Sequence, residues 1–109
     1  MLKIKIADTF CGRFFGLMRK EKLPKGYGLL LAPCNGIHML FMKFSIDAIY
    51  IDKNFVIKKI VPNLKTWFGI SFCFNAWGVV EVTAGEAERL NLKVGERLET
   101  EFVNDSKIF

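Results

Sequence analysis

A two-residue alternation of apolar and polar side chains dominates the chain. It is clearest at residues 2–6, 48–52, 55–61 and 70–74. This period places successive side chains on opposite faces of a β-strand. The turn-favouring residues Asp52-Lys53-Asn54 separate two of these runs. The pattern therefore predicts a β-hairpin between strands at residues 46–51 and 55–61.

Further short apolar runs predict more strands. They lie at residues 27–31, 37–41, 78–83 and 97–103. Pro24, Pro33 and Pro62 are expected in the connections between strands. About seven or eight short strands predict a mainly β fold, a compact barrel or sandwich.

Two segments have a helical pattern instead. After Thr9, residues 11–19 place apolar side chains at spacings of three and four, which predicts one or two helical turns. Thr83 lies three residues before Glu86, the spacing of a capping box, and a second helical pattern continues towards Gly95. We therefore expect two short helices beside the strands.

Length and composition fit one globular domain covering residues 1–109. Of the 109 residues, 51% are hydrophobic and 25% are charged, a balance that excludes a disordered chain. No apolar run approaches the roughly 20 residues that a membrane-spanning helix needs. We expect a domain with its own core and no membrane span.

Charge is distributed unevenly along the chain. Residues 1–65 contain 12 Lys and Arg against 4 Asp and Glu, whereas residues 66–109 contain 4 against 7. The basic part could face an anionic partner. However, 12 of the 16 basic residues are dispersed lysines, which is typical of a solvated surface and disfavours nucleic acid as a partner.

The three cysteines are far apart in the sequence. They are Cys11, Cys34 and Cys73, and an odd number cannot all pair within one chain. We expect reduced thiols and a cytoplasmic location.

Three sequence blocks carry a family resemblance. They are Arg13-x-x-Gly16-Leu17-Met18, the run Ile-Asp-Ala-Ile-Tyr-Ile-Asp at residues 46–52, and Val-Glu-Val-Thr-Ala-Gly at residues 80–85 with Gly95 following. In this order and spacing they resemble the prokaryotic family catalogued as domain of unknown function 192. The resemblance covers nearly the whole chain. It implies a compact β-rich fold with short helices, and it implies no known reaction.

Asp47 and Glu81 are acidic residues within apolar strands. On a strand at residues 46–51, Asp47 shares a face with Ile49 and Ile51, so its carboxylate needs a partner. Arg13 can supply two hydrogen bonds. One hypothesis is a buried salt bridge that sets strand register. The other is a ligand pocket floored by Arg13, Asp47 and Glu81, with His38 as a further candidate.

Cys34, His38 and Met42 follow one another at intervals of four residues. They are a soft ligand set suited to copper, but strand positions eight apart lie roughly 26 Å apart. We therefore predict no metal site and interpret them as structural residues.

An enzyme hypothesis makes Cys34 the nucleophile, His38 its base and Asp47 the residue that orients the imidazole. No nucleophile-elbow motif surrounds Cys34.

Aromatic residues are concentrated between Trp67 and Trp77. Alternation of Ile70, Phe72 and Phe74 predicts that this side of a strand faces the core. Aromatic residues beside lysines would also suit a platform for single-stranded nucleic acid. A homodimer contact through this segment is a third interpretation.

The glycines form no phosphate-binding motif, so we predict no nucleotide cofactor. The sequence favours a small non-catalytic ligand-binding or accessory module whose biochemical function is unknown. The alternatives are a small Cys/His hydrolase and a single-stranded nucleic-acid-binding domain.

Overall fold

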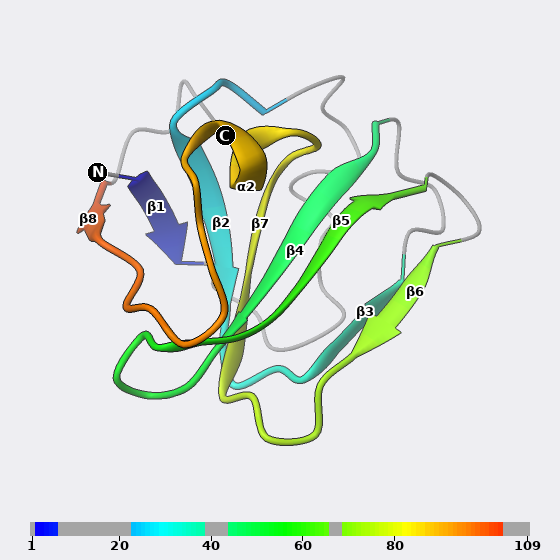
Figure 1. The fold of residues 1–109 in the computed structure, drawn as a ribbon, viewed down its shortest axis with the longest axis vertical. Coiled ribbons are helices and arrows are strands. Elements are labelled where there is room, and N and C mark those ends of the chain that lie inside the picture. The colour runs from blue at the N-terminus through cyan, green and yellow to red at the C-terminus, as the bar shows by residue number, and fades with distance from the viewer. Residues whose placement is uncertain (1, 7–22, 39–43, 66–68, 104–109) are drawn as a thin grey trace.

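A computed structural model describes residues 2–6, 23–38, 44–65 and 69–103 (Figure 1). These residues form strands and one helix, which are β1 (Leu2–Ile6), β2 (Tyr27–Leu31), β3 (Gly36–His38), β4 (Ile46–Ile51), β5 (Ile57–Leu64), β6 (Ile70–Phe72), β7 (Gly78–Thr83), α2 (Glu86–Arg89) and β8 (Thr100–Phe102). The expected mainly β fold is confirmed. The helix expected at residues 11–19 lies outside the described residues.

The strands form two sheets. Six strands are ordered β5-β4-β7-β2-β1-β8, and β3 pairs with β6 in a separate two-stranded sheet. Most pairs are antiparallel, but β1 runs parallel to both β2 and β8. Figure 1 shows β3 and β6 lying apart from the larger sheet, as in a sandwich. Of the two architectures that the sequence predicted, the fold is sandwich-like and not a closed barrel.

The predicted hairpin joins β4 to β5. These strands pair antiparallel, with Ile49 opposite Ile60. In the turn, Asp52 Oδ1 accepts hydrogen bonds of 2.8 Å from the Asn54 backbone N–H and 3.0 Å from the Val56 backbone N–H. A short acidic side chain that binds the backbone two residues ahead is a recognised turn former. The turn chemistry read from the sequence is therefore confirmed.

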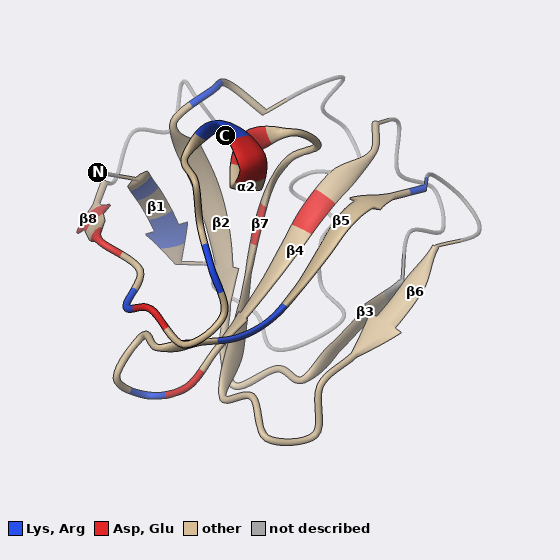
Figure 2. Cartoon of the chain, viewed as in Figure 1, with Lys and Arg blue, Asp and Glu red and all other residues tan. Residues whose placement is uncertain are grey.

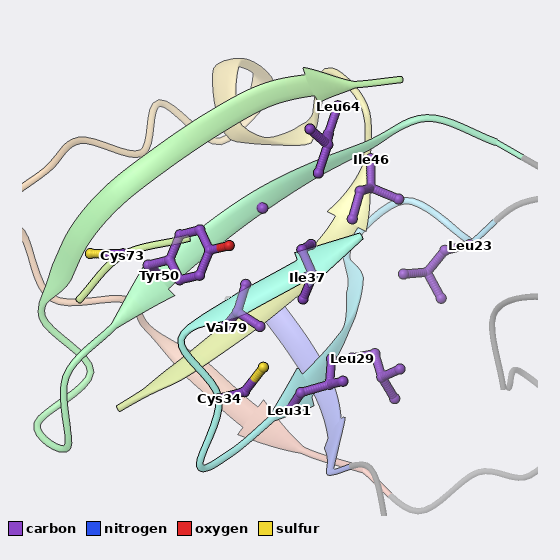
Figure 3. Packing of buried hydrophobic residues seen from close by; sticks show 11 residues of the cluster. Leu23, Leu29, Leu31, Cys34, Ile37, Ile46, Tyr50, Leu64, Cys73 and Val79 are labelled. Atoms are coloured by element: carbon purple, nitrogen blue, oxygen red, sulfur yellow. The ribbon is translucent and has the colours of Figure 1, made fainter. Parts of the chain in front are cut away.

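Two hydrophobic clusters cover opposite faces of the larger sheet. Figure 3 shows the first, in which Ile46, Tyr50 and Val79 of the larger sheet lie near Ile37 of β3. The second cluster includes Ile49 and Val80 on the opposite face, with partly buried side chains from residues 90 and 92 packed against it. Because both faces are covered, β4 is buried along its whole length.

A buried hydrogen bond connects the two sheets through the first cluster. The Tyr50 hydroxyl and Ser71 Oγ are 2.6 Å apart. Burial is the main cause that raises the pKa of the Tyr50 phenol, so the hydroxyl stays neutral. This bond fixes β6 against β4.

Within the described ranges, no helix combines the length and apolar character that crossing a bilayer requires.

Candidate functional site

Asp47 binds three backbone N–H groups. It is the second residue of β4 and is 1% exposed. Its Oδ1 accepts a 2.8 Å hydrogen bond from Asn63, and its Oδ2 accepts bonds of 3.0 Å from Gly85 and 2.9 Å from Ala87. Hydrogen bonds from backbone N–H groups to a carboxylate are among the stronger ones in proteins. The expected need for a partner is met by the backbone, and Arg13 lies outside the described residues.

These donors come from two irregular points of the chain. Opposite Asp47, the pairing of β4 with β5 shifts register, and Asn63 has a left-handed φ of 51°. The short helix α2 begins after Gly85, which also has a positive φ, 98°. Asp47 therefore fixes a β-bulge and caps a helix at the same time.

The capping box predicted at Thr83 is wrong. Thr83 Oγ1 donates a hydrogen bond to the Leu23 carbonyl oxygen, so it does not bind the N–H groups of α2. Glu86 Oε2 instead accepts the Gly26 N–H at 2.7 Å and Arg89 Nη2 at 2.9 Å. The Arg89 hydrogen bond is the main cause that lowers the pKa of the Glu86 carboxyl. The sequence analysis missed this pair, although the spacing of three residues on a helix signals it.

Glu81 is a fully buried carboxyl group on β7. It is 0% exposed, and neither of its oxygens has a hydrogen-bond partner among the described residues. Its strand neighbours are Leu29 and Ala48, both members of the first cluster. Burial raises the pKa of Glu81 to about 8. Glu81 is therefore mostly protonated at neutral pH.

The two acids point to opposite faces of the larger sheet. Asp47 lies opposite Val82, which belongs to the second cluster, whereas Glu81 lies opposite Ala48 of the first. A pocket floored by both carboxyl groups is therefore not formed. His38 pairs with Ile70 through the β3–β6 ladder, but its imidazole is outside the described part of the chain. The predicted grouping of Arg13, His38, Asp47 and Glu81 is not assembled from the residues described.

Cys34 is a buried residue beside a surface cleft. It is 5% exposed and disulfide-bonded, which corrects the expectation of a reduced thiol at this position. Cys73 is free and buried, as expected. The enzyme hypothesis needs a thiolate at Cys34, and a sulfur in a disulfide supplies none. Met42, the third member of the proposed set of soft ligands, lies outside the described residues.

The structure places apolar side chains of β6 and the following loop in solvent. Ile70 is 75% exposed, Phe72 is 54% exposed and Phe74 is 86% exposed. Ser71 and Cys73, between them, are the buried residues. The prediction that the alternating apolar side faces the core is therefore wrong. The β3–β6 sheet covers the first cluster with one face only, and Ser71 occupies that face by binding Tyr50. We call Ile70, Phe72 and Phe74 the β6 apolar row.

Lys59 of β5 contacts this row at Phe72. Its Nζ donates a 2.8 Å hydrogen bond to the Phe72 carbonyl oxygen and lies 5.6 Å from the centroid of the Phe72 ring. The Phe72 and Phe74 rings meet edge to face, with centroids 5.0 Å apart. The row is thus a packed surface in which a cation borders two aromatic rings.

Open clefts adjoin the end of the row. One, of about 470 Å³, is lined by Asp52, Lys53, Asn54, Phe74, Asn75, Ala76 and Trp77. A second, of about 310 Å³, shares Ala76 and Trp77 and extends to Pro33, Cys34 and Asn35. A cavity of about 300 Å³ lies elsewhere, between Leu2, Ile57 and residues 90–99. The β6 apolar row and the cleft beside Phe74 form the candidate functional surface.

Comparisons with known proteins agree with this architecture. The profile of a family described as an uncharacterised conserved group, DUF192 (Uncharacterized ACR), matches residues 1–100. The chain belongs to the DUF192 family. A UPF0127 protein of Pyrococcus furiosus is 32% identical over 105 residues, which cover 90% of this chain and 86% of the relative. The resemblance inferred from the sequence blocks is confirmed.

Two solved structures share the fold of this DUF192 member. A candidate transcription regulator from Sinorhizobium meliloti 1021 aligns with a TM-score of 0.74 and 22% identity, over 88% of this chain and 79% of that one. A protein of unknown function from Novosphingobium aromaticivorans aligns with a TM-score of 0.69 and 21% identity, over 76% and 64%. At these identities the likeness concerns the fold alone. The biochemical function of the family is not characterised.

Proposed function

We propose that the protein is a non-catalytic binding module whose contact surface is the β6 apolar row. The observation that carries the proposal is the exposure of Ile70, Phe72 and Phe74 at alternate positions of one segment. Solvated apolar residues that adjoin one another are unfavourable unless they meet a partner, and such patches mark interaction sites. Aromatic residues are enriched in binding surfaces for the same reason.

Two of the three buried acids among the described residues support a non-catalytic role. Asp47 is occupied by three backbone donors, and Glu86 is held by Gly26 and Arg89. A general acid or base must reach the proton that it transfers. Asp47 and Glu86 instead serve the backbone of the same chain, so their arrangement favours a structural role.

The finer assignments made from the sequence stay predictions. A homodimer through residues 67–77 would use the same row. A cytoplasmic location also stays a prediction.

A neutral hydrophobic dye tests the proposed contact surface. We expect Nile red fluorescence with the wild-type protein to fall strongly in the triple variant Ile70→Thr, Phe72→Ser, Phe74→Ser. Phe102→Ser is the matched control, because Phe102 has the same 54% exposure as Phe72 but lies on β8. Equal dye binding by the wild-type protein and a folded triple variant would contradict the proposal.

A further inference from the structure

We infer that the β6 apolar row docks on the surface of an anionic phospholipid bilayer, inserting its side chains among the headgroups. This inference rests on the proposed function and names the partner of the same surface. It is carried by the lysines beside the row, the charge of the remaining chain, and the shape of the apolar surface.

A row of exposed lysines follows the apolar row. Lys59 contacts Phe72 directly, and Lys53 lines the same cleft as Phe74. Lys65 accepts, through its carbonyl oxygen, a 3.0 Å hydrogen bond from the N–H of Gly69, the residue before Ile70. We call Lys53, Lys59 and Lys65 the lysine row. Lys59 therefore places a cation on Phe72, and Lys53 and Lys65 belong to the segments beside the two ends of the row.

The surrounding charge gives the molecule an orientation towards a negative surface. Residues 52–77 contain four lysines and one acid, Asp52. Asp52 is already engaged by two backbone N–H groups and lies 3.7 Å from Lys58 Nζ. Residues 78–109 contain 7 acids against 4 basic residues, although Glu81 is buried and Glu86 is paired with Arg89. Figure 2 shows no acid on β3 or β6. An anionic surface would therefore attract the side carrying the lysine row.

The shape of the row suits a bilayer. Its exposed side chains offer on the order of 500 Å² of apolar surface that insertion among headgroups can bury. Phe74, 86% exposed, stands out from the surface. A bilayer accommodates such a protrusion without a matching groove. Apolar insertion combined with lysines is how interfacial proteins gain membrane affinity.

The ring geometry argues against single-stranded nucleic acid as the partner. Base stacking needs a free aromatic face. The Phe72 ring has Lys59 Nζ above it and Phe74 against it. Within the β6 apolar row this leaves the exposed Phe74 ring to stack, and one ring is no platform for successive bases. Insertion into headgroups needs only apolar contact, so the same geometry permits it.

Co-sedimentation with vesicles tests the inference on the full chain. The vesicles are phosphatidylcholine alone, or phosphatidylcholine mixed with phosphatidylglycerol. We expect binding to the mixed vesicles that weakens as salt increases, and little binding to phosphatidylcholine alone. Lys59→Gln is expected to weaken binding about fivefold, and Phe74→Ser about tenfold. Lys59→Arg retains the charge and is expected to bind like the wild-type protein.

Matched control variants test whether vesicle binding depends on this surface and not on the general charge and hydrophobicity of the protein. Lys93→Gln removes an exposed lysine outside the lysine row, and Phe102→Ser removes an exposed aromatic residue outside the β6 apolar row. Both are expected to bind as the wild type does. Equal binding to both vesicle types, or equal loss in the control variants, would overturn the inference.

The same protein samples test the other candidate partners of the β6 apolar row. Binding to a single-stranded oligonucleotide without binding to mixed vesicles would overturn the inference in favour of nucleic acid. A dimer in sedimentation velocity that Phe74→Ser dissociates, again without vesicle binding, would assign the row to a second copy of the chain. If vesicle binding fails while the dye experiment succeeds, only the bilayer assignment fails. If the dye experiment fails, the contact surface itself is refuted.

Discussion

The carboxylate of Asp47 accepts the backbone N–H of Ala87, 40 residues further along the chain, at 2.9 Å. The same side chain binds Gly85 and, on β5, Asn63. A single buried acid thus holds a central strand, a bulge on its neighbour and the start of α2. Removing this carboxylate should destabilise all three of these parts of the structure.

Asp47→Ala is expected to lower the free energy of unfolding by about 3 kcal/mol or more, because three largely buried N–H groups lose their acceptor. Urea denaturation followed by circular dichroism measures the change. Asp52→Ala is the control, since this turn residue binds two N–H groups where water can replace it, and it should cost about 1 kcal/mol. Similar losses for both variants would show that Asp47 has no special role.

Glu81 is expected to make stability decrease as pH rises. Its pKa is about 8 in the folded protein against an ordinary value of 4.5, so the unfolded chain loses this proton first. The contribution of Glu81 to stability is therefore largest below pH 4.5 and falls up to pH 8, by at most about 1.4 kcal/mol per pH unit. Melting temperatures of Glu81→Gln across this range should lack that fall.

Glu86 provides a control of opposite sign. Arg89 lowers its pKa in the folded protein, so its contribution is present above the ordinary pKa and is lost as the pH falls below it. Glu86→Gln should therefore reduce stability at neutral pH and leave the decrease between pH 4.5 and 8 in place. If Glu81→Gln retains the wild-type pH profile, the account of the buried carboxyl group is wrong.

The Tyr50–Ser71 hydrogen bond should show energetic coupling. Tyr50→Phe leaves the Ser71 hydroxyl without its 2.6 Å partner, which is expected to cost about 1–2 kcal/mol. The double variant Tyr50→Phe, Ser71→Ala leaves neither polar group unpaired, so it should cost less than the sum of the single variants. A double-mutant cycle from urea denaturation measures the difference. Strict additivity would mean that the bond does not stabilise the contact between the sheets.

Alternation along the chain correctly predicted which residues share a strand face. Asp47 does lie on the side of Ile49 and Ile51, two members of the second cluster. Its binding partners could not be predicted, because they are backbone N–H groups brought there by a bulge and a helix start. The separation of Asp47 from Glu81 depends on the register between β4 and β7, which a single strand pattern does not contain.

The error at β6 has a different physical cause. Alternation shows that Ile70, Phe72 and Phe74 share a face, but not which face meets the core. Ser71 and Cys73 are small enough to fit under the short β3–β6 sheet, and the Ser71 hydroxyl finds Tyr50. The larger residues therefore face solvent. The sequence correctly predicted which residues share a face. Which of the two faces meets the core is decided by packing against β4.

The strand order has a consequence for synthesis on the ribosome. β1 is synthesised before its outer neighbour β8, which ends at Phe102. That margin of the sheet can close only after β8 has left the exit tunnel. Until then the nascent β1 presents an open side on which chaperones can act.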